Sequence, residues 1–205
     1  MQMLNDLDRL GIQQQKEWGE IFTGFETSNR YAVMDERGHE ICYAAEISEG
    51  LGTWLLKNWL KAARPFTIKL LDAEGRSVLE VKRPFRFFFH EANIHGPDGE
   101  FMGNIKRQFS LLRRIYTIYD ADGVEQAQLF GPILRPWTFL IRRDGVESGG
   151  AIRKQWSGFL KEGFSDADNF GIEFPPNATP TLKAVLLGSV FLIDFCHFEN
   201  TSNNN

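Results

Sequence analysis

The chain has 205 residues, of which 42% are hydrophobic and 24% are charged, a mixture that suits an ordinary globular domain with one sizeable core. The net charge of −4 argues against bulk nucleic-acid binding, so we expect no nucleic-acid partner. The two cysteines, Cys42 and Cys196, are too few for a disulfide framework, which favours a reducing, cytoplasmic compartment.

Residues 1–20 form the first segment of the chain. They carry no basic region followed by an apolar stretch, so we do not expect a secretory signal here. We expect instead a lead segment ahead of the main domain. That domain is predicted over residues 21–199 with no internal linker, and the polar residues 200–205 are expected to be a disordered tail.

Pairs of short β-like runs, separated by turns rich in Asp and Gly, recur along the chain. The turns are DERG, DAEG, GPDG, DADG and DG, at residues 35–38, 72–75, 96–99, 120–123 and 144–145. Such turns between runs rich in Val, Ile, Phe and Tyr are the usual signal for a hairpin. In one run Phe66, Ile68 and Leu70 share a face, as in a half-buried strand. A series of hairpins predicts one all-β barrel or sandwich.

Four basic residues lie close together in the middle of the chain. They are Lys106, Arg107, Arg113 and Arg114, and no acidic residue separates them before Asp120. If these side chains cluster, each would attract anionic lipid by about 1 kcal/mol near a membrane surface. The alternative is that they are ordinary solvated faces of strands.

The most apolar stretch of the sequence runs from Thr181 to Glu199. A membrane-spanning helix needs about 20 predominantly apolar residues. Leu182–Phe198 supplies seventeen, and these include Lys183, Asp194 and His197, of which a charged Asp194 would be costly in hydrocarbon. Because apolar side chains cover nearly every direction of the expected helix, it must be buried all round. A closed barrel around it is the favoured prediction, and a membrane span is the alternative.

Several long segments resemble the phospholipid scramblase family. They are TGFETSNRYAV, CYAAE, RPFTIKLLDAEG, VLEVKRPFR, KQWSGFLKEGFSDADNFGIEFP and LKAVLLGSVFLIDFCHFE. The resemblance runs from about Leu7 to Glu199, nearly the whole chain. It implies a tubby-like fold, an all-β closed barrel of about twelve antiparallel strands around a buried hydrophobic helix, expected here at residues 181–199.

The resemblance also implies a function, namely calcium-stimulated, bidirectional movement of phospholipids between membrane leaflets. A barrel filled by its own helix has no groove through which a headgroup could slide. A narrower role therefore stays open, in which a cytoplasmic protein docks peripherally on the inner face of the membrane and binds anionic phospholipid headgroups. A third alternative is a soluble interaction or regulatory module without lipid transport, whose protein partners the sequence does not predict.

This sequence departs from animal scramblases in its anchors. Those proteins carry a Pro-rich N-terminal extension and runs of palmitoylated cysteine, and neither is present here. The segments WLLKNWLK, RPFRFFFHEAN and GPILRPWTFLI stand where cysteine-rich stretches would be. Thioester-linked acyl chains are therefore not expected to anchor this protein, and we hypothesise that exposed aromatic side chains replace them.

Two aromatic segments are candidates for that role. Trp54, Leu55, Trp59 and Leu60 share one stripe of an expected helix, with Lys57, Lys61 and Arg64 nearby. Aromatic and basic residues in this arrangement are typical of an interfacial helix. The run Phe87, Phe88 and Phe89 is a second possible contact. The alternative is that the Trp stripe caps the barrel end and that Phe87 and Phe89 belong to the core.

The resemblance places the family's calcium loop at residues 166–177. The matching ligand positions are Asp166, Asp168, Phe170, Ile172, Phe174 and Asn177. Only two of these side chains are carboxylates, so calcium, the one cofactor expected, would bind weakly. In the alternative, a turn at 166–169 leads into a strand with Phe170, Ile172 and Phe174 on one face, whose hydrogen bonds would use the carbonyls that the ion needs.

Catalytic motifs are absent from the sequence. The four histidines, His39, His90, His95 and His197, show no metal-binding spacing such as HExxH. The sequence also contains no GxSxG, P-loop or GxGxxG motif. We therefore expect a lipid-handling protein and not an enzyme.

Overall fold

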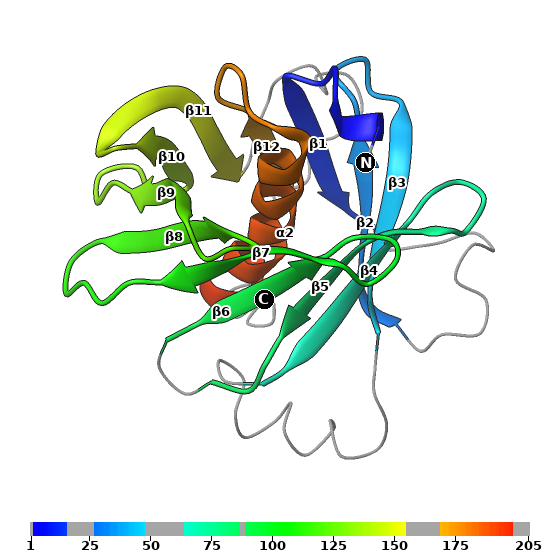
Figure 1. Ribbon diagram of the computed structural model, residues 1–205, viewed down its shortest axis with the longest axis horizontal. Helices are drawn as coiled ribbons and strands as arrows, with labels where there is room; N and C mark the ends of the chain where they lie inside the picture. The colour runs from blue at the N-terminus through cyan, green and yellow to red at the C-terminus, as the bar shows by residue number, and fades with distance from the viewer. Residues whose placement is uncertain (1, 16–26, 48–63, 87–88, 155–168, 199–205) are drawn as a thin grey trace.

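The computed structural model describes residues 2–15, 27–47, 64–86, 89–154 and 169–198, and the structural statements below concern these residues. Twelve antiparallel strands close into a barrel around one C-terminal helix (Figure 1). Around the barrel each strand lies beside its neighbour in the chain, and the first strand closes the circle between the second and the twelfth. The predicted all-β barrel with a buried helix is therefore confirmed.

The elements follow one another without a second domain in the described part of the chain. Their bounds are η1 (Gln2–Leu4), β1 (Arg9–Gln14), β2 (Thr27–Met34), β3 (Glu40–Ile47), β4 (Phe66–Leu71), β5 (Ser77–Arg83), β6 (Glu91–His95), β7 (Phe101–Arg107), β8 (Arg114–Asp120), β9 (Glu125–Gly131), β10 (Thr138–Arg143), β11 (Val146–Lys154), β12 (Asn169–Glu173) and α2 (Pro180–His197). The five hairpins predicted from the Asp/Gly turns are β2–β3, β4–β5, β6–β7, β8–β9 and β10–β11.

The turn between β2 and β3 shows why these segments reverse the chain. The Asp35 carboxylate accepts hydrogen bonds from the backbone N–H groups of Arg37 and His39, both at 2.8 Å. Gly38 adopts a φ of 81°, which costs a residue without a side chain little. The same Asp-to-backbone pattern recurs at Asp72 and Asp120, so local chemistry alone fixes three of the hairpins.

The lead segment expected over residues 1–20 differs from the structure. Arg9–Gln14 is a barrel strand, in which Leu10 lies opposite Ile172 of β12 and Ile12 lies opposite Val33 of β2. Leu10 and Ile12 are fully buried. The barrel therefore begins before residue 20, and the short RLGIQQ segment is recognisable as a strand only through partners that are distant in sequence.

Helix α2 lies along the barrel interior (Figure 1). By length and composition it is the one helix among the described residues that would cross a membrane, yet 78% of it is buried inside the protein. Thr179 caps its N-terminus by accepting a hydrogen bond from the Leu182 N–H, and Pro180 occupies the first turn, where no N–H is needed. The membrane-span alternative therefore does not describe this structure, because the barrel itself buries the apolar helix.

Gly188 lets α2 approach β5 and β6 closely. A Cβ atom at this position would lie 2.7 Å from Cγ1 of Ile94 and 3.2 Å from Cγ2 of Val81. In an exposed helix, replacing glycine by alanine gains about 1 kcal/mol. Here we expect Gly188→Ala to lower the free energy of unfolding by about 1–3 kcal/mol, because the added methyl group overpacks the core.

Urea denaturation would measure the effect of Gly188→Ala. The matched control is Gly188→Ala combined with Ile94→Ala, which makes room for the new methyl group. The double variant should lose less stability than the sum of the two single losses, as expected for residues in contact. A stabilised Gly188→Ala single variant would contradict the placement of α2 inside the barrel.

Candidate functional site

The two ends of the barrel are built differently. One end, here called the turn end, carries the five hairpin turns and the N-terminus of α2. The opposite end, here called the loop end, carries the C-terminus of α2 and the connections β5–β6, β7–β8 and β9–β10. Since consecutive strands are antiparallel, the connections β1–β2, β3–β4 and β11–β12 also start and finish there.

Most of the exposed apolar side chains gather at the loop end. They are Phe85, Phe89, Phe109, Leu111, Leu112, Ile133, Leu134 and Trp137, here called the apolar tips. Leu111 and Leu134 are 87% and 94% exposed, far beyond what a core or a strand face requires. The other large apolar side chains exposed in the described residues are Phe101, Val124 and Val146, which lie beside hairpin turns. A contiguous group of exposed apolar residues marks an interaction surface.

Basic side chains lie among the apolar tips. Lys106 and Arg107 end β7, Arg114 begins β8, and Arg113 lies in the connection between these strands. The four basic residues singled out in the sequence thus meet at the loop end. Arg114 is partly engaged there, since its guanidinium lies 4.6 Å from the centre of the Phe139 ring and donates to the carbonyl oxygen of Pro136.

Two acidic side chains in the described part of the loop end are paired with basic ones. Glu91 accepts a hydrogen bond from Arg86 at 2.6 Å, and Glu46 forms a buried ion pair with Arg64. The sequence has no Asp or Glu from Lys106 to Tyr119. Within the described residues, the loop end therefore combines basic side chains with exposed apolar ones, which suits a partner with an anionic surface and an apolar layer beneath it.

A buried polar cluster underlies these loops at the C-terminus of α2. The Tyr116 hydroxyl lies 2.8 Å from Nε2 of His197, and the Arg83 guanidinium lies 2.6 Å from Nδ1 of His90. Burial, helped by the nearby positive charges of Arg114 and other residues, lowers the pKa of His197 to about 3. Burial also lowers the pKa of His90 to about 4, with Arg83 contributing. Both imidazoles are therefore neutral at physiological pH and act as packed hydrogen-bonding groups.

Asp194 joins the same buried layer. Its carboxylate accepts a hydrogen bond of 2.8 Å from the Tyr31 hydroxyl and lies 3.4 Å from the Lys154 ammonium. Positive side chains near a helix C-terminus also interact favourably with the helix dipole. Asp194, a charged residue within the apparent membrane segment, is thus satisfied by the barrel wall.

The residues of the expected calcium loop are spread along β12. Phe170 and Ile172 point into the core, and the strand is paired with β1 on one side and β11 on the other. Phe174 is also buried, and its N–H donates to the carbonyl oxygen of Asp8. Asn177 lies past the turn-end terminus of the strand, whereas Asp166 and Asp168 lie outside the described residues.

This arrangement matches the strand that the sequence offered as the alternative to an ion loop. The structure does not bring Asn177 to the start of β12, where Phe170 lies. Within the described ranges no group of three or more His, Cys, Asp or Glu side chains is placed to hold a metal ion. A calcium site would therefore depend on Asp166 and Asp168, and it stays a prediction.

The predicted aromatic anchors are only partly within the described residues. Trp54, Lys57, Trp59 and Lys61 lie outside them, as do Phe87 and Phe88. Phe89 is 59% exposed, so the alternative that placed it in the core is wrong. Arg64, expected near the Trp stripe, is buried against Glu46 and the Phe195 ring, so its charge is not presented to a surface.

Most of the apolar tips were not predicted from the sequence. Phe109, Leu111 and Leu112 follow a predicted strand, and Ile133 and Leu134 lie between two prolines, Pro132 and Pro136. Apolar residues within turn-forming segments were the available signal. Their gathering at one end follows only from the order of the strands around the barrel.

Comparisons with known proteins agree with this architecture. A family model described as Scramblase matches residues 1–200. The chain is 35% identical to phospholipid scramblase 1 of Mus musculus, over 99% of this chain and 65% of that protein. It is 34% identical to phospholipid scramblase 2 of Bos taurus, over 98% of this chain and 72% of that protein. It thus spans about two thirds of the length of the mouse relative. No solved structure matches the chain.

Proposed function

Because the chain belongs to the scramblase family, we propose that it acts in phospholipid scrambling by docking the loop end of its barrel on anionic phospholipid. Family membership supports a lipid-translocating role and not a catalytic one. The observation that carries the docking step is the meeting of the apolar tips and four basic side chains at one end of the barrel.

The magnitudes make such docking favourable. Each basic side chain near an anionic surface contributes about 1 kcal/mol. Fully burying a leucine or phenylalanine side chain contributes about 1.5–3 kcal/mol, so even partial insertion of several tips adds comparably. Neither group alone would hold a protein firmly, because basic residues are screened by salt and single apolar tips are small. Together they favour a membrane whose surface is negatively charged.

The barrel interior restricts how lipid can move. Helix α2 fills it with buried side chains, so a phospholipid headgroup would have to cross the membrane outside the barrel. Extracting α2 to make a channel would remove the core, at a cost beyond the 5–15 kcal/mol by which a domain of this kind is stable. Bidirectional movement of phospholipid, in this proposal, takes place where the loop end perturbs the bilayer.

Calcium stimulation belongs to the same proposal. Asp166 and Asp168 immediately precede β12, whose first residue, Asn169, lies at the loop end. Calcium prefers six to eight oxygen ligands, so two carboxylates leave most of its coordination shell open. Phosphate oxygens of a docked membrane would supply the remaining ligands. A calcium ion would then strengthen docking while binding weakly in the absence of lipid.

The anionic lipids that such a surface needs are concentrated in the cytoplasmic leaflet. Neither Cys42 nor Cys196 forms a disulfide, which is compatible with a reducing compartment. We therefore place the protein in the cytoplasm, peripherally bound to the inner face of the membrane. Other partners, including proteins, are not part of this proposal.

Vesicle co-sedimentation tests the docking surface. We expect Leu112→Ser combined with Leu134→Ser to weaken binding to phosphatidylserine-containing vesicles by at least about tenfold, since two exposed leucines no longer insert. The matched control is Val124→Ser combined with Val146→Ser, which removes two exposed apolar side chains at the turn end. This control should bind as the unmodified protein does.

A charge variant separates electrostatics from insertion. Lys106→Gln combined with Arg113→Gln should weaken binding to anionic vesicles and reduce its salt dependence, while binding to uncharged phosphatidylcholine vesicles stays unchanged.

Equal losses of vesicle binding in the leucine variant and the turn-end control would contradict the assignment of the loop end as the docking surface. Absence of vesicle binding by the unmodified protein would favour a soluble interaction module, and a fluorescent-lipid flip assay on purified protein would separate docking from scrambling.

A further inference from the structure

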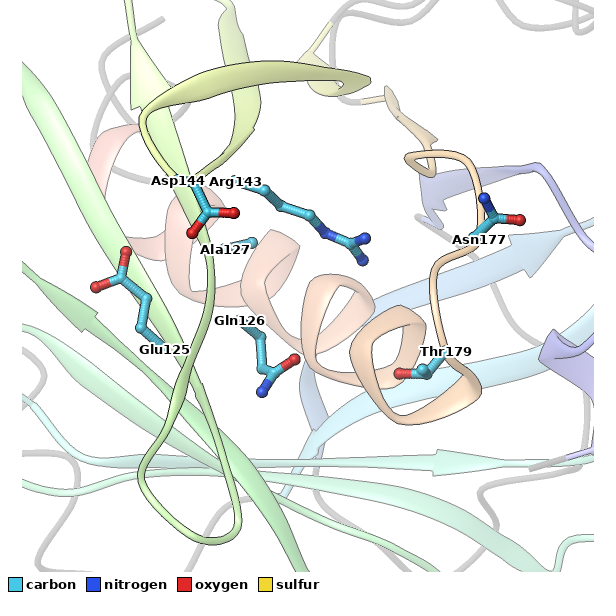
Figure 2. Close-up of a pocket in the computed structure, with 7 residues that line it drawn as sticks. All are labelled: Glu125, Gln126, Ala127, Arg143, Asp144, Asn177 and Thr179. Atoms are coloured by element: carbon cyan, nitrogen blue, oxygen red, sulfur yellow. The ribbon is translucent and has the colours of Figure 1, made fainter.

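The turn end of the barrel holds a polar pocket of about 600 Å³ (Figure 2). It is lined by three segments that are distant in sequence, and its residues are Glu125, Gln126, Ala127, Arg143, Asp144, Asn177 and Thr179. Strand β9, the end of β10 with its turn, and the connection into α2 each supply part of it. The pocket lies at the opposite end of the barrel from the apolar tips, so a surface-docked protein would leave it open to the solution.

Arg143 has an unused hydrogen-bonding capacity in this pocket. Its Nε atom is buried and has no hydrogen-bond partner among the described residues. Its neighbour Arg142 lies 3.8 Å from Glu147, whereas Arg143 forms no ion pair within the described part of the chain. Figure 2 shows the guanidinium extending across the pocket toward Asn177 and Thr179. A buried N–H without an acceptor is costly, and a ligand oxygen would remove that cost.

The side of the pocket away from the Arg143 guanidinium is acidic. Glu125 and Asp144 are exposed, and Figure 2 shows both carboxylates on the side of the pocket from which Arg143 extends. Neither forms an ion pair within the residues that the structure describes. The pocket therefore has a carboxylate side and a guanidinium that points away from it.

The wall of the pocket at Thr179 adds to the positive charge of Arg143. Thr179 is the N-cap of α2, so the N-terminal end of an 18-residue helix faces this part of the pocket. The partial positive charge of a helix N-terminus favours an anionic group. The partial positive charge of the helix N-terminus acts here beside Arg143, which is the residue that a ligand would contact.

We propose that this pocket binds a small zwitterion from solution. A ligand carboxylate would accept paired hydrogen bonds from the Arg143 guanidinium, whose fork matches the two carboxylate oxygens. A primary ammonium on the same molecule would lie between Glu125 and Asp144. A purely anionic ligand would be repelled by these two carboxylates, and a purely cationic one would leave Arg143 without an acceptor. This site is independent of the docking surface.

In the experiment, ω-amino acids of increasing length are titrated into the protein. Binding is measured by nuclear magnetic resonance of the backbone amides. The probes are glycine, beta-alanine, gamma-aminobutyric acid and epsilon-aminocaproic acid, with butyric acid and butylamine as singly charged controls. We expect at least one amino acid to bind saturably with a dissociation constant of about 1 mM or below. Both singly charged controls should bind at least about tenfold more weakly.

Variants assign the two charges. Arg143→Gln should abolish saturable binding of every probe. Glu125→Gln combined with Asp144→Asn should remove the advantage of the amino acid over butyric acid. Asparagine suits position 144 because Asp144 has a φ of 51°, a conformation that asparagine tolerates well. Glu147→Gln, on a carboxylate outside the pocket, is the matched control and should bind as the unmodified protein does.

Three results would overturn the assignment. The first is the absence of a saturable shift with every probe. The second is equal binding by Arg143→Gln when its thermal unfolding shows that it is folded. The third is butyric acid binding as tightly as the best amino acid, which would leave only an anion site. Vesicle binding should be unchanged in all of these variants, so failure of this proposal would be distinguishable from failure of membrane docking.

Discussion

Phe191→Ala is expected to lower the free energy of unfolding by about 4 kcal/mol. Phe191 lies in the middle of α2, is 1% exposed, and packs edge-to-face on Tyr31 of β2 with the ring centres 5.2 Å apart. Truncating it removes buried apolar contact and leaves a cavity. The cavity would persist because the closed ring of hydrogen-bonded strands limits how far the wall can collapse onto the helix.

Urea denaturation followed by circular dichroism measures this loss, and Phe109→Ala is its matched control. Phe109 is 77% exposed at the loop end, so its removal should change stability by no more than about 0.5 kcal/mol. The same control variant should weaken vesicle binding, whereas Phe191→Ala should leave it unchanged while the protein is folded. A loss below about 1 kcal/mol in Phe191→Ala would mean that α2 is not the centre of the core.

The placement of α2 illustrates what sequence alone predicts well. Its length and its uniform apolar coverage, interrupted by Lys183 and Asp194, were sufficient to predict a helix buried in a barrel. The hairpins were equally accessible because Asp and Gly fix each turn through bonds within a few residues, as at Asp72 and Gly75. Both kinds of signal are local, so neither needs knowledge of the rest of the fold.

The features that were missed depend on contacts between distant segments. Strand β1 carries only two inward apolar residues, Leu10 and Ile12, and its role is defined by β2 and β12. Leu134 lies between Pro132 and Pro136 and gives no sign in the sequence that it lies at the same end of the barrel as Leu112. The polar pocket likewise brings Arg143 near Thr179 only because β10 ends where α2 begins.

The barrel therefore separates three roles in space. The core is apolar and built around α2, the loop end is apolar and basic, and the turn end carries the polar pocket. The polar residues of α2 belong to this division, since Asp194 is satisfied near the loop end and Lys183 near the turn end. A helix whose two ends make such contacts with the barrel is held in one axial position.

Lys183→Met should show how strongly the turn-end contact holds α2, with an expected loss of about 3 kcal/mol in the free energy of unfolding. The Lys183 ammonium is buried and donates to the carbonyl oxygens of Leu4, Asn5 and Leu7, at 3.0, 2.8 and 2.7 Å. Methionine preserves the length of the side chain but leaves these carbonyls without a donor. Hydrogen bonds to a charged group are worth about 1.5–3 kcal/mol each, and relief of the buried charge offsets part of their sum.

The matched control is Lys82→Met. Lys82 is half exposed and pairs with Glu80 at 2.7 Å, and an exposed ion pair of this kind contributes no more than about 1 kcal/mol. Hydrogen exchange in the native state distinguishes a local effect from a global one, since Lys183→Met should release the amides of residues 2–7 well before those of β6 and β7. Equal stability losses in the two variants, or unchanged exchange at residues 2–7, would mean that the ammonium is dispensable and that packing of the apolar side chains alone fixes α2 within the barrel.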